Sequence, residues 1–327
     1  MKAIVITRAG GPEVLEVQER PKPEPGAGQI RVRVRASALN RADISQRRGN
    51  YPAPPGAPAD ISGMEYAGEV DALGPQSSLW RVGSRVMGIV GGGGHAEYLC
   101  VHEGEAIPVP ASLSWEEAAA IPEAFITAYD ALFNRLQLQS GETVLIHAAG
   151  SGVGTAAIQI ARVSGATVVG TSRSAGKLER AKQFGLDVAI DASRGDWAAE
   201  VEAALGAERV HAIMDLVGGS YLDGNLRVLA QWGRIVVVGL TAGARAELNM
   251  AVLLRKRVTM VGTVLRARAL EEKISLAREF SERVIPLFEK GRLRPVVDRV
   301  FSFSEIRAAH ELMESNETFG KIVLRWE

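Results

Sequence analysis

The sequence predicts an α/β protein in which a doubly wound parallel sheet is inserted between the two parts of a β-rich domain. Three observations carry this prediction. Residues 1–122 hold short strand-like segments divided by loops rich in proline and glycine. From residue 143, short apolar segments alternate with helical segments of about 10–15 residues, as in a parallel sheet with helices on both faces. The length of 327 residues favours about two domains.

The β-rich part begins the chain. The segment from Ile30 to Arg35 alternates apolar and polar residues, which is typical of a half-buried strand. Loops with several prolines or glycines interrupt such segments at 21–28, 51–58, 91–94 and 108–110. Loops held by short strands are common walls of active sites. We therefore assign residues 1–123 to the first part of this domain.

The inserted sheet is expected within residues 124–265. Ser114 and Glu117 form a capping box that opens an alanine-rich helix just before it. Strands are predicted at 143–148, 167–170, 188–190, 210–216, 234–239 and 258–264, and helices at 153–163 and 175–184. Residues 266–327 return to the β-rich domain with a long helix, a strand at 297–301, a helix at 304–315 and a strand at 321–326.

Charge and composition exclude several classes of function. The 38 basic and 38 acidic side chains cancel, so we expect neither nucleic acid nor a membrane surface as a partner. Cys100 is the one cysteine, which rules out an intrachain disulfide and a cysteine-based metal cluster. No apolar stretch reaches the roughly 18 residues of a membrane span, and the first residues do not resemble a signal peptide. We expect a cytoplasmic protein.

The segment from Thr143 to Gly154 is the most informative. A buried strand runs into a glycine-rich turn, and a helix rich in small residues follows. Glycines let the backbone approach a pyrophosphate, and the N–H groups at the helix N-terminus attract it. The spacing from Ala148 through Ser151 to Gly154 departs from G-x-G-x-x-G, and a tight connection alone would also explain it. With further strand–helix units behind it, the turn predicts a Rossmann dinucleotide-binding domain.

NADPH is expected rather than NADH. A site for NAD places an acidic residue at the end of the second strand, where it binds the ribose 2′-hydroxyl. This chain has Arg173 and Lys177 there, with Ser172 as an additional donor, and no acid before Glu179. Both cations suit a 2′-phosphate. They could instead be surface charges, but cations are unfavourable at a helix N-terminus without an anion.

The chain resembles the zeta-crystallin-like quinone oxidoreductases, a zinc-free branch of the medium-chain dehydrogenase/reductases, and most of all their tumour-suppressor-inducible animal members. The matching stretches include 37–43, 46–51, 118–124, 147–159, 218–221 and 320–323. The resemblance implies a GroES-like catalytic domain with an inserted Rossmann domain, reduction of quinones by NADPH, and a homodimer joined through edge strands of the Rossmann sheet.

The resemblance also assigns site residues by position. Those near the nicotinamide and the substrate are Asn40, Asp43, Tyr51 and Thr127, and the first three are the catalytic candidates. The residues at the pyrophosphate are Ser151, Gly152, Val153 and Gly154. Those at the 2′-phosphate are Ser172 and Lys177. Those along the cofactor are Gly239, Leu240, Val264 and Leu265. One departure stands out. Several relatives have a cofactor-facing tyrosine where this chain reads Asp191-Ala192-Ser193, which implies weaker binding on the adenine side.

No metal is expected. Catalytic zinc takes cysteine, histidine or carboxylate ligands, usually three of them. Zinc-dependent relatives have cysteine and Gly-His-Glu where this chain has Asn40 and Gly63-Met-Glu65. Glu65 and Glu123 remain near this position by the resemblance, without a histidine or a thiolate. The structural-zinc lobe needs four cysteines and is absent.

A quinone suits a site without a strong acid, because its reduced oxygen belongs to an aromatic ring and needs little help. Tyr51 either donates a hydrogen bond to that oxygen or packs against the proline-rich loop. Two other functions remain open. One is a 2-alkenal or enoyl reductase, in which Tyr51 would protonate carbon. The other is a non-catalytic NADPH-binding protein of the crystallin kind.

Overall fold

The computed structural model describes residues Met1–Trp326, and its contacts divide them into two compact units. The first unit is Met1–Ile126 together with the chain from Leu265 onwards, and the second unit is Thr127–Val264. The sequence analysis placed these boundaries after residues 123 and 265. In the structure, the first boundary along the chain falls inside helix α3 (Pro122–Tyr129), so each unit contains part of this helix.

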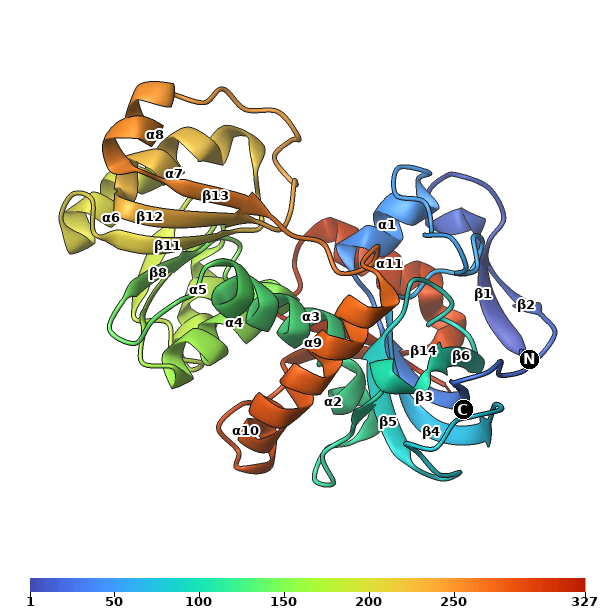
Figure 1. The fold of residues 1–327 in the computed structure, drawn as a ribbon. Coiled ribbons are helices and arrows are strands. Elements are labelled where there is room, and N and C mark those ends of the chain that lie inside the picture. Colours follow the sequence, from blue (N-terminus) through green and yellow to red (C-terminus); the bar gives the residue numbers. More distant parts are fainter. Residues whose placement is uncertain (327) are drawn as a thin grey trace. The chain divides into compact units, whose positions relative to one another are not determined.

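A seven-stranded sheet organises the first unit. Its order is β14-β15-β3-β4-β5-β7, with β6 also paired to β3, and β1 and β2 form a separate hairpin. The strands are β1 (Lys2–Ile6), β2 (Leu15–Glu19), β3 (Gln29–Ala38), β4 (Glu65–Leu73), β5 (Arg85–Ile89), β6 (Tyr98–His102), β7 (Ile107–Pro108), β14 (Val297–Ser302) and β15 (Lys321–Arg325). Strand β15 pairs antiparallel with β3, so the end of the chain completes the sheet that its beginning starts (Figure 1).

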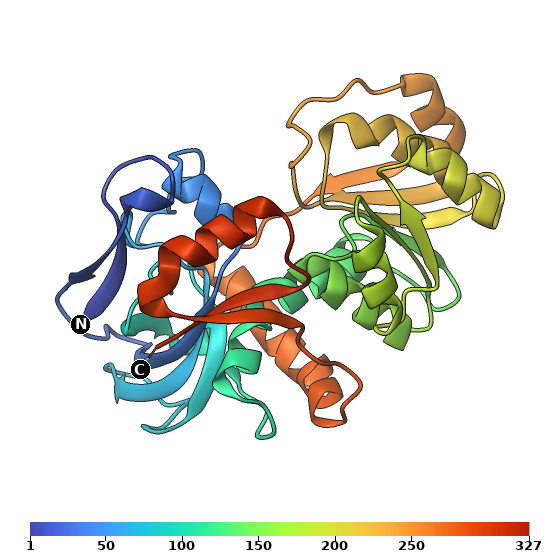
Figure 2. The ribbon, with the colours of Figure 1, turned by 180° about the vertical axis from the view of Figure 1, so that it is seen from behind.

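The alternation predicted for β3 is confirmed, because Ile30, Val32 and Val34 lie in the core of this sheet. The helices of the unit are α1 (Arg41–Arg47), α2 (Trp115–Ala119), α9 (Leu270–Arg283), α10 (Ile285–Glu289) and α11 (Ile306–Ser315). Helix α11, red in Figure 2, packs Ile306 and Met313 into the same core. The capping box at Ser114 is also present, although its helix α2 ends at Ala119.

Six parallel strands form the sheet of the second unit, in the order β10-β9-β8-β11-β12-β13. This is the order of doubly wound dinucleotide-binding sheets. The strands are β8 (Thr143–Ile146), β9 (Thr167–Ser172), β10 (Val188–Asp191), β11 (Val210–Asp215), β12 (Leu229–Val237) and β13 (Thr259–Gly262). The helices are α4 (Gly152–Val163), α5 (Ala175–Lys182), α6 (Trp197–Leu205), α7 (Leu222–Val228) and α8 (Met250–Lys256). The predicted fold class is therefore confirmed.

Helices cover both faces of this sheet (Figure 1). On one face, Val201 of α6 and Leu226 of α7 share an apolar cluster with strand residues such as Leu145 and Ile213. Helix α4 buries mainly small residues, which allow close packing against β8 and β9. The order of the strands reverses between β8 and β11, so the turn after β8 lies at the topological switch point where such sheets bind ligands.

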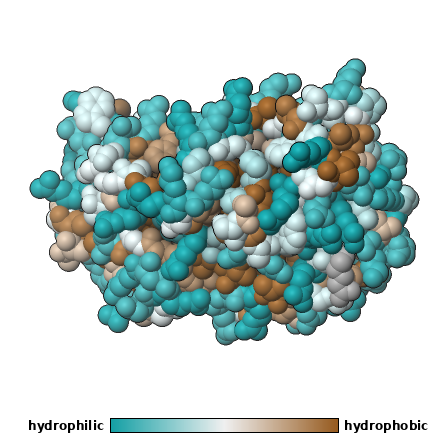
Figure 3. Space-filling model, turned by 90° about the horizontal axis from the view of Figure 1, so that it is seen from below, coloured by the Kyte–Doolittle hydropathy of each residue, from teal (hydrophilic) through white to brown (hydrophobic). Residues whose placement is uncertain are grey.

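Hydrophilic side chains predominate on the face shown in Figure 3, where apolar residues form separate patches. Within residues 1–326, no helix combines the length and the apolar character that crossing a membrane requires.

Candidate functional site

The glycine-rich turn after β8 has the geometry of an anion-binding site. Ser151 precedes α4, and its hydroxyl accepts a hydrogen bond from the Gly154 N–H at 3.0 Å. A Cβ atom on Gly154 would lie 2.4 Å from the carbonyl oxygen of Ala148, so the turn closes only with glycine at this position. Ser151, Gly152 and Val153 are partly exposed. The first N–H groups of a twelve-residue helix are thus presented at an accessible turn.

The side chain of Lys177 lies across this turn. A Cβ atom on Gly150 would come within 2.9 Å of the Lys177 side chain, so glycine leaves room for the lysine stem. Ser174 caps helix α5, and its backbone N–H donates to the Ser172 hydroxyl at 3.2 Å. Arg173 is exposed beside them. Two cations and two hydroxyls therefore surround the end of β9, next to the anion-binding turn.

The strand register places the carboxylate of Asp191 here, a residue considered from the sequence only as part of the stretch where relatives have a tyrosine. Asp191 ends β10 and is the register partner of Ser172 on β9. Its carboxylate accepts hydrogen bonds from the Ser193 N–H at 3.0 Å and the Ser193 hydroxyl at 2.6 Å, and it pairs with Arg194 at 3.3 Å. The Ser193 hydroxyl lowers the pKa of Asp191. The carboxylate thus has partners in its own turn.

A buried histidine joins the ends of neighbouring strands. The ring of His147 lies 2.8 Å from the Thr171 hydroxyl and 2.6 Å from the Asn225 side-chain oxygen. Burial lowers the pKa of His147, so the ring is neutral at pH 7. Trp197 and Tyr221 meet this ring edge-on, and they stack on each other. In the sequence, His147 and Tyr221 stand out only as parts of the stretches that match the family.

The remaining predicted positions of the second unit differ in access. Leu240 is 54% exposed and Val264 is 49% exposed. Gly239 is packed so closely that a Cβ atom would lie 2.6 Å from the carbonyl oxygen of Leu216. Thr127 is nearly buried in α3. Leu265, the first residue of the next segment of the first unit, is also buried.

In the first unit, the Asp43 carboxylate connects two backbone segments through hydrogen bonds. Its carboxylate is fully buried and accepts hydrogen bonds from the Asn40 N–H at 2.8 Å and the Gly63 N–H at 2.9 Å. The ring of His95 lies 3.9 Å away. The structure thus connects the Asp43 carboxylate to the backbone of Asn40 and Gly63, and the predicted place of Asn40 and Asp43 beside the nicotinamide stays a prediction.

Lys321 is the central residue beside Asn40. Its ammonium lies 2.6 Å from the Asn40 side-chain oxygen, 2.6 Å from a Glu65 carboxylate oxygen and 2.8 Å from the Leu39 carbonyl oxygen. Asn40 also donates to the same Glu65 oxygen at 2.9 Å. Between Met1 and Trp326, no three histidine, cysteine or acidic side chains are grouped to hold a metal ion. With an ammonium between Asn40 and Glu65, this donor set does not fit zinc.

Glu123 follows in the same neighbourhood. Its backbone N–H donates to the second oxygen of Glu65 at 2.8 Å. Burial raises the pKa of Glu123 to about 8, the nearby Glu65 carboxylate adds to the rise, and the Lys321 ammonium opposes it. The carboxyl group of Glu123 therefore carries a proton at pH 7.

Tyr51 lies under a guanidinium group. Arg266 stands 5.0 Å from the centre of the Tyr51 ring and donates to the Tyr51 carbonyl oxygen at 3.3 Å. The same guanidinium donates to Gln46 at 2.6 Å and to the Gly91 carbonyl oxygen at 2.7 Å. Burial raises the pKa of Tyr51, so its hydroxyl stays protonated. The proline-rich and glycine-rich loops predicted as walls are thus joined by Arg266, which the sequence analysis did not single out.

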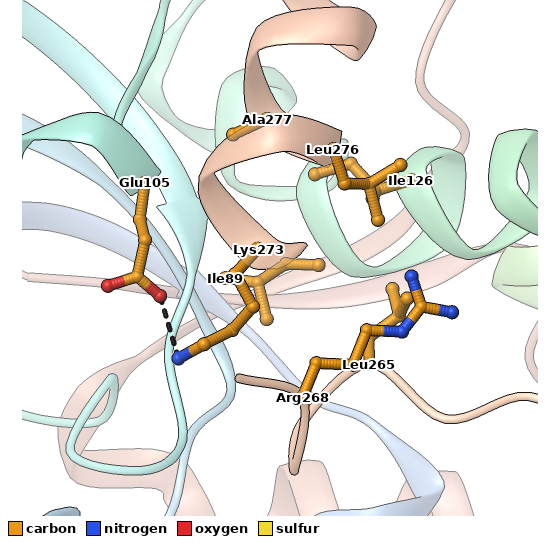
Figure 4. Close-up of a pocket in the computed structure, with 8 residues that line it drawn as sticks. All are labelled: Ile89, Glu105, Ile126, Leu265, Arg268, Lys273, Leu276 and Ala277. Carbon is orange, nitrogen blue, oxygen red and sulfur yellow. Dashed lines mark ion pairs between the residues drawn. The ribbon is translucent and has the colours of Figure 1, made fainter. Parts of the chain in front are cut away.

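A small apolar pocket adjoins Leu265 in the first unit. Figure 4 shows Ile89, Ile126 and Leu276 around it, with the ion pair between Lys273 and Glu105 on one side. The two charged groups lie 2.8 Å apart.

Comparison with known proteins supports both units. The model of the alcohol dehydrogenase GroES-like domain matches residues 26–111, and that of the zinc-binding dehydrogenase matches residues 152–287. A quinone oxidoreductase of Pseudomonas aeruginosa is 32% identical to this chain over 324 residues, and the alignment covers 99% of each protein. A solved structure of an NAD-dependent alcohol dehydrogenase is 34% identical, with a TM-score of 0.89 and full coverage of both chains. The CurK enoyl reductase is 29% identical with a TM-score of 0.87, over 99% of this chain and 98% of that one.

Proposed function

Because the chain belongs to the medium-chain dehydrogenase/reductase superfamily and is related over its whole length to quinone oxidoreductases, we propose that it reduces quinones with NADPH and without a metal. The observation that carries the proposal is the Lys321 ammonium between Asn40 and Glu65. Chemistry that needs a metal as Lewis acid is not supported by such a donor set. A quinone needs no such help.

The cofactor would be held mainly by the second unit. The pyrophosphate would meet the turn of Ser151, Gly152, Val153 and Gly154, and the 2′-phosphate would meet Ser172, Arg173 and Lys177. Thr127, Gly239, Leu240, Val264 and Leu265 would follow it toward the nicotinamide. NADPH supplies a hydride when bound. The turn that Gly154 permits would present the first N–H groups of α4 to the phosphates.

The first unit supplies the groups near the substrate. Tyr51 keeps its hydroxyl proton and would donate a hydrogen bond to the oxygen that gains charge. Arg266 orients Tyr51 from the face of its ring. Asn40 and Asp43 were predicted as catalytic residues. Because the Asn40 amide is hydrogen-bonded to Glu65 and Lys321, and the Asp43 carboxylate accepts from two backbone N–H groups, we assign both residues positioning roles at the start of α1.

Reduction of an activated C=C bond is the second candidate. Such a reaction delivers a hydride to one carbon and a proton to its neighbour, so it needs a proton donor. Glu123 holds a proton at neutral pH and, with Tyr51, provides two protonated groups in the first unit. The likeness to the CurK enoyl reductase points the same way.

The test is NADPH consumption with ortho-quinones, para-quinones and enones measured in parallel. We expect turnover with at least one quinone at a kcat/KM well above that of every enone. Turnover confined to enones would replace the first proposal with the second. Absence of turnover with all of them, although NADPH binds, would favour a non-catalytic NADPH-binding protein.

A further inference from the structure

The ammonium of Lys321 is buried and makes a complete set of contacts. This lysine is the first residue of β15, and 6% of its side chain is exposed. Three oxygen atoms lie 2.6–2.8 Å from its ammonium: the Leu39 carbonyl, the Asn40 side-chain oxygen and one Glu65 carboxylate oxygen. An ammonium group has three N–H donors. Each of them therefore has an acceptor.

These oxygens belong to segments far apart in the sequence. Leu39 and Asn40 lie between β3 and α1, and Glu65 begins β4. The other oxygen of Glu65 accepts the Glu123 N–H at the start of α3. One cation on β15 thus connects the beginnings of α1, β4 and α3, which carry the candidate groups of the first unit.

The charge balance favours a fixed cation here. Glu65 is fully buried, and a buried carboxylate without a cation is strongly unfavourable. Lys321 is the one cation that the structure places in contact with this carboxylate among the described residues. The Asn40 amide contacts both groups, with its oxygen toward Lys321 and its nitrogen toward Glu65.

We propose that the Lys321 ammonium supplies the fixed positive charge of the first unit and fills the place that a metal ion would need. This charge positions Asn40, Glu65 and the start of α3. Lys321 is a positioning residue, because each N–H donor of its ammonium already has a protein acceptor. The inference goes beyond the proposed function. In zinc-dependent relatives this position suits a zinc ion. In this chain the positive charge at the position belongs to the side chain of Lys321.

The test is chemical rescue of Lys321→Ala. This substitution removes the side chain beyond Cβ, and n-propylammonium has the atoms that are lost, whereas 1-propanol has a similar shape without the charge. We expect the unfolding temperature to fall by roughly 5–10 °C. At equal ionic strength, n-propylammonium should recover at least half of this loss and 1-propanol should not.

Lys256→Ala is the matched control. Its ammonium is also buried and binds three carbonyl oxygens, those of Leu226, Arg227 and Leu229, at 2.7–2.8 Å in the second unit. Both variants should lose stability. Only Lys321→Ala should lower kcat for a quinone, at least tenfold, with the KM for NADPH within about twofold of wild type. Added n-propylammonium should restore that kcat.

Three results would overturn the proposal. They are recovery by 1-propanol equal to that by n-propylammonium, wild-type stability in Lys321→Ala, and one tightly bound zinc in the wild-type protein after dialysis. If Lys321→Ala does not fold, Lys321→Met keeps the apolar stem, and wild-type stability and kinetics in that variant would equally contradict the idea. Bound zinc would contradict the metal-free part of the proposed function as well. The unfolding measurements need no quinone, so they test the role of Lys321 independently of the proposed function.

Discussion

A 2′-phosphate gives Lys177 a partner that NADH lacks. Lys177 lies across the phosphate-binding turn, and each charge-assisted hydrogen bond contributes about 1.5–3 kcal/mol. We expect Lys177→Ala to lower kcat/KM for NADPH about tenfold, to leave NADH almost unchanged, and to have a smaller effect at high salt. Lys182→Ala is the control, because it removes a charge from the last turn of the same helix. Equal use of both nucleotides by the wild-type protein would mean that Arg173 and Lys177 are ordinary surface charges.

The hydroxyl of Tyr51 can be tested by itself. Tyr51→Phe keeps the ring under Arg266 and removes one hydrogen-bond donor. If that donor stabilises the reduced oxygen, kcat/KM should fall by about tenfold to a hundredfold, or roughly 1.4–2.7 kcal/mol. Tyr98→Phe, whose ring lies under Lys22, should leave the kinetics unchanged. Identical kinetics for Tyr51→Phe and wild type would leave Tyr51 with packing alone.

Glu123 should make stability fall as the pH rises. Its pKa of about 8 in the folded protein lies above its ordinary value, so the folded state binds more protons than the unfolded state between these two values. The resulting stabilisation is complete below the unfolded pKa and is lost as the pH passes about 8. Glu123→Gln should therefore unfold at a higher temperature than wild type at pH 8.5, with little difference at pH 4.

Exposed Glu311 on α11 provides the control, and Glu311→Gln should not change this dependence. A wild-type unfolding temperature that is constant from pH 5 to pH 8.5 would contradict the raised pKa.

Individual residues were predictable where their role depends on local sequence. Ser151 and Gly154 could be assigned because a cap and a close turn are read within a few residues of the chain. Lys321 could not, since its contact with Leu39 joins positions 282 residues apart. Two signals were available in the sequence. Lys321 belongs to the matching stretch 320–323, and it begins a predicted strand whose next three residues are apolar.

At the scale of elements, strands and helices of the second unit follow the periodicity of the sequence to within a few residues. The strand β12 is an exception and begins at Leu229, five residues before the predicted start. The π-helix at Asp130–Arg135 was not predicted either. Its Asp130 is buried and accepts a hydrogen bond from the Thr263 hydroxyl at 2.8 Å. This partner is 133 positions away in the sequence, and local periodicity does not predict such a contact.

The turn between β8 and α4 gives a prediction for an element. A methyl group at position 154 would lie 2.4 Å from the Ala148 carbonyl oxygen and 3.0 Å from the Ala149 backbone, and neither can move cheaply. Gly154→Ala should destabilise the protein by about 1–3 kcal/mol and weaken NADPH binding, measured by thermal unfolding and by titration. Gly176→Ala in α5 is the matched control. Only the Ser174 hydroxyl lies nearby, at 3.9 Å, so this variant should be as stable as wild type or more so. Unweakened NADPH binding by Gly154→Ala would remove the turn from the site.

At the scale of the whole molecule, the insertion could be predicted because the strand–helix rhythm starts and stops within the sequence. The pairing of the last strand, β15, and its contribution to the ion cluster could not be predicted. β15 pairs with β3 and also carries Lys321, so the C-terminal segment completes both the sheet and the ion cluster of the first unit. Periodicity predicts that residues 321–326 form a strand, but pairing between the ends of a chain depends on tertiary packing.

The open edge of the second sheet is where we expect two chains to associate. β13 is an edge strand, and Met260 on it is 40% exposed, with Trp232 on the neighbouring β12 also exposed. An unpaired apolar edge favours pairing with another strand. Light scattering should therefore give twice the mass of one chain for the wild-type protein. Met260→Lys should reduce the mass to that of a monomer, because a charge would enter the joined edge. Val300→Lys is the control, since Val300 is equally exposed on β14, the edge strand of the other sheet, and this variant should remain a dimer. A dimer that survives Met260→Lys and dissociates in Val300→Lys would move the interface to the first unit.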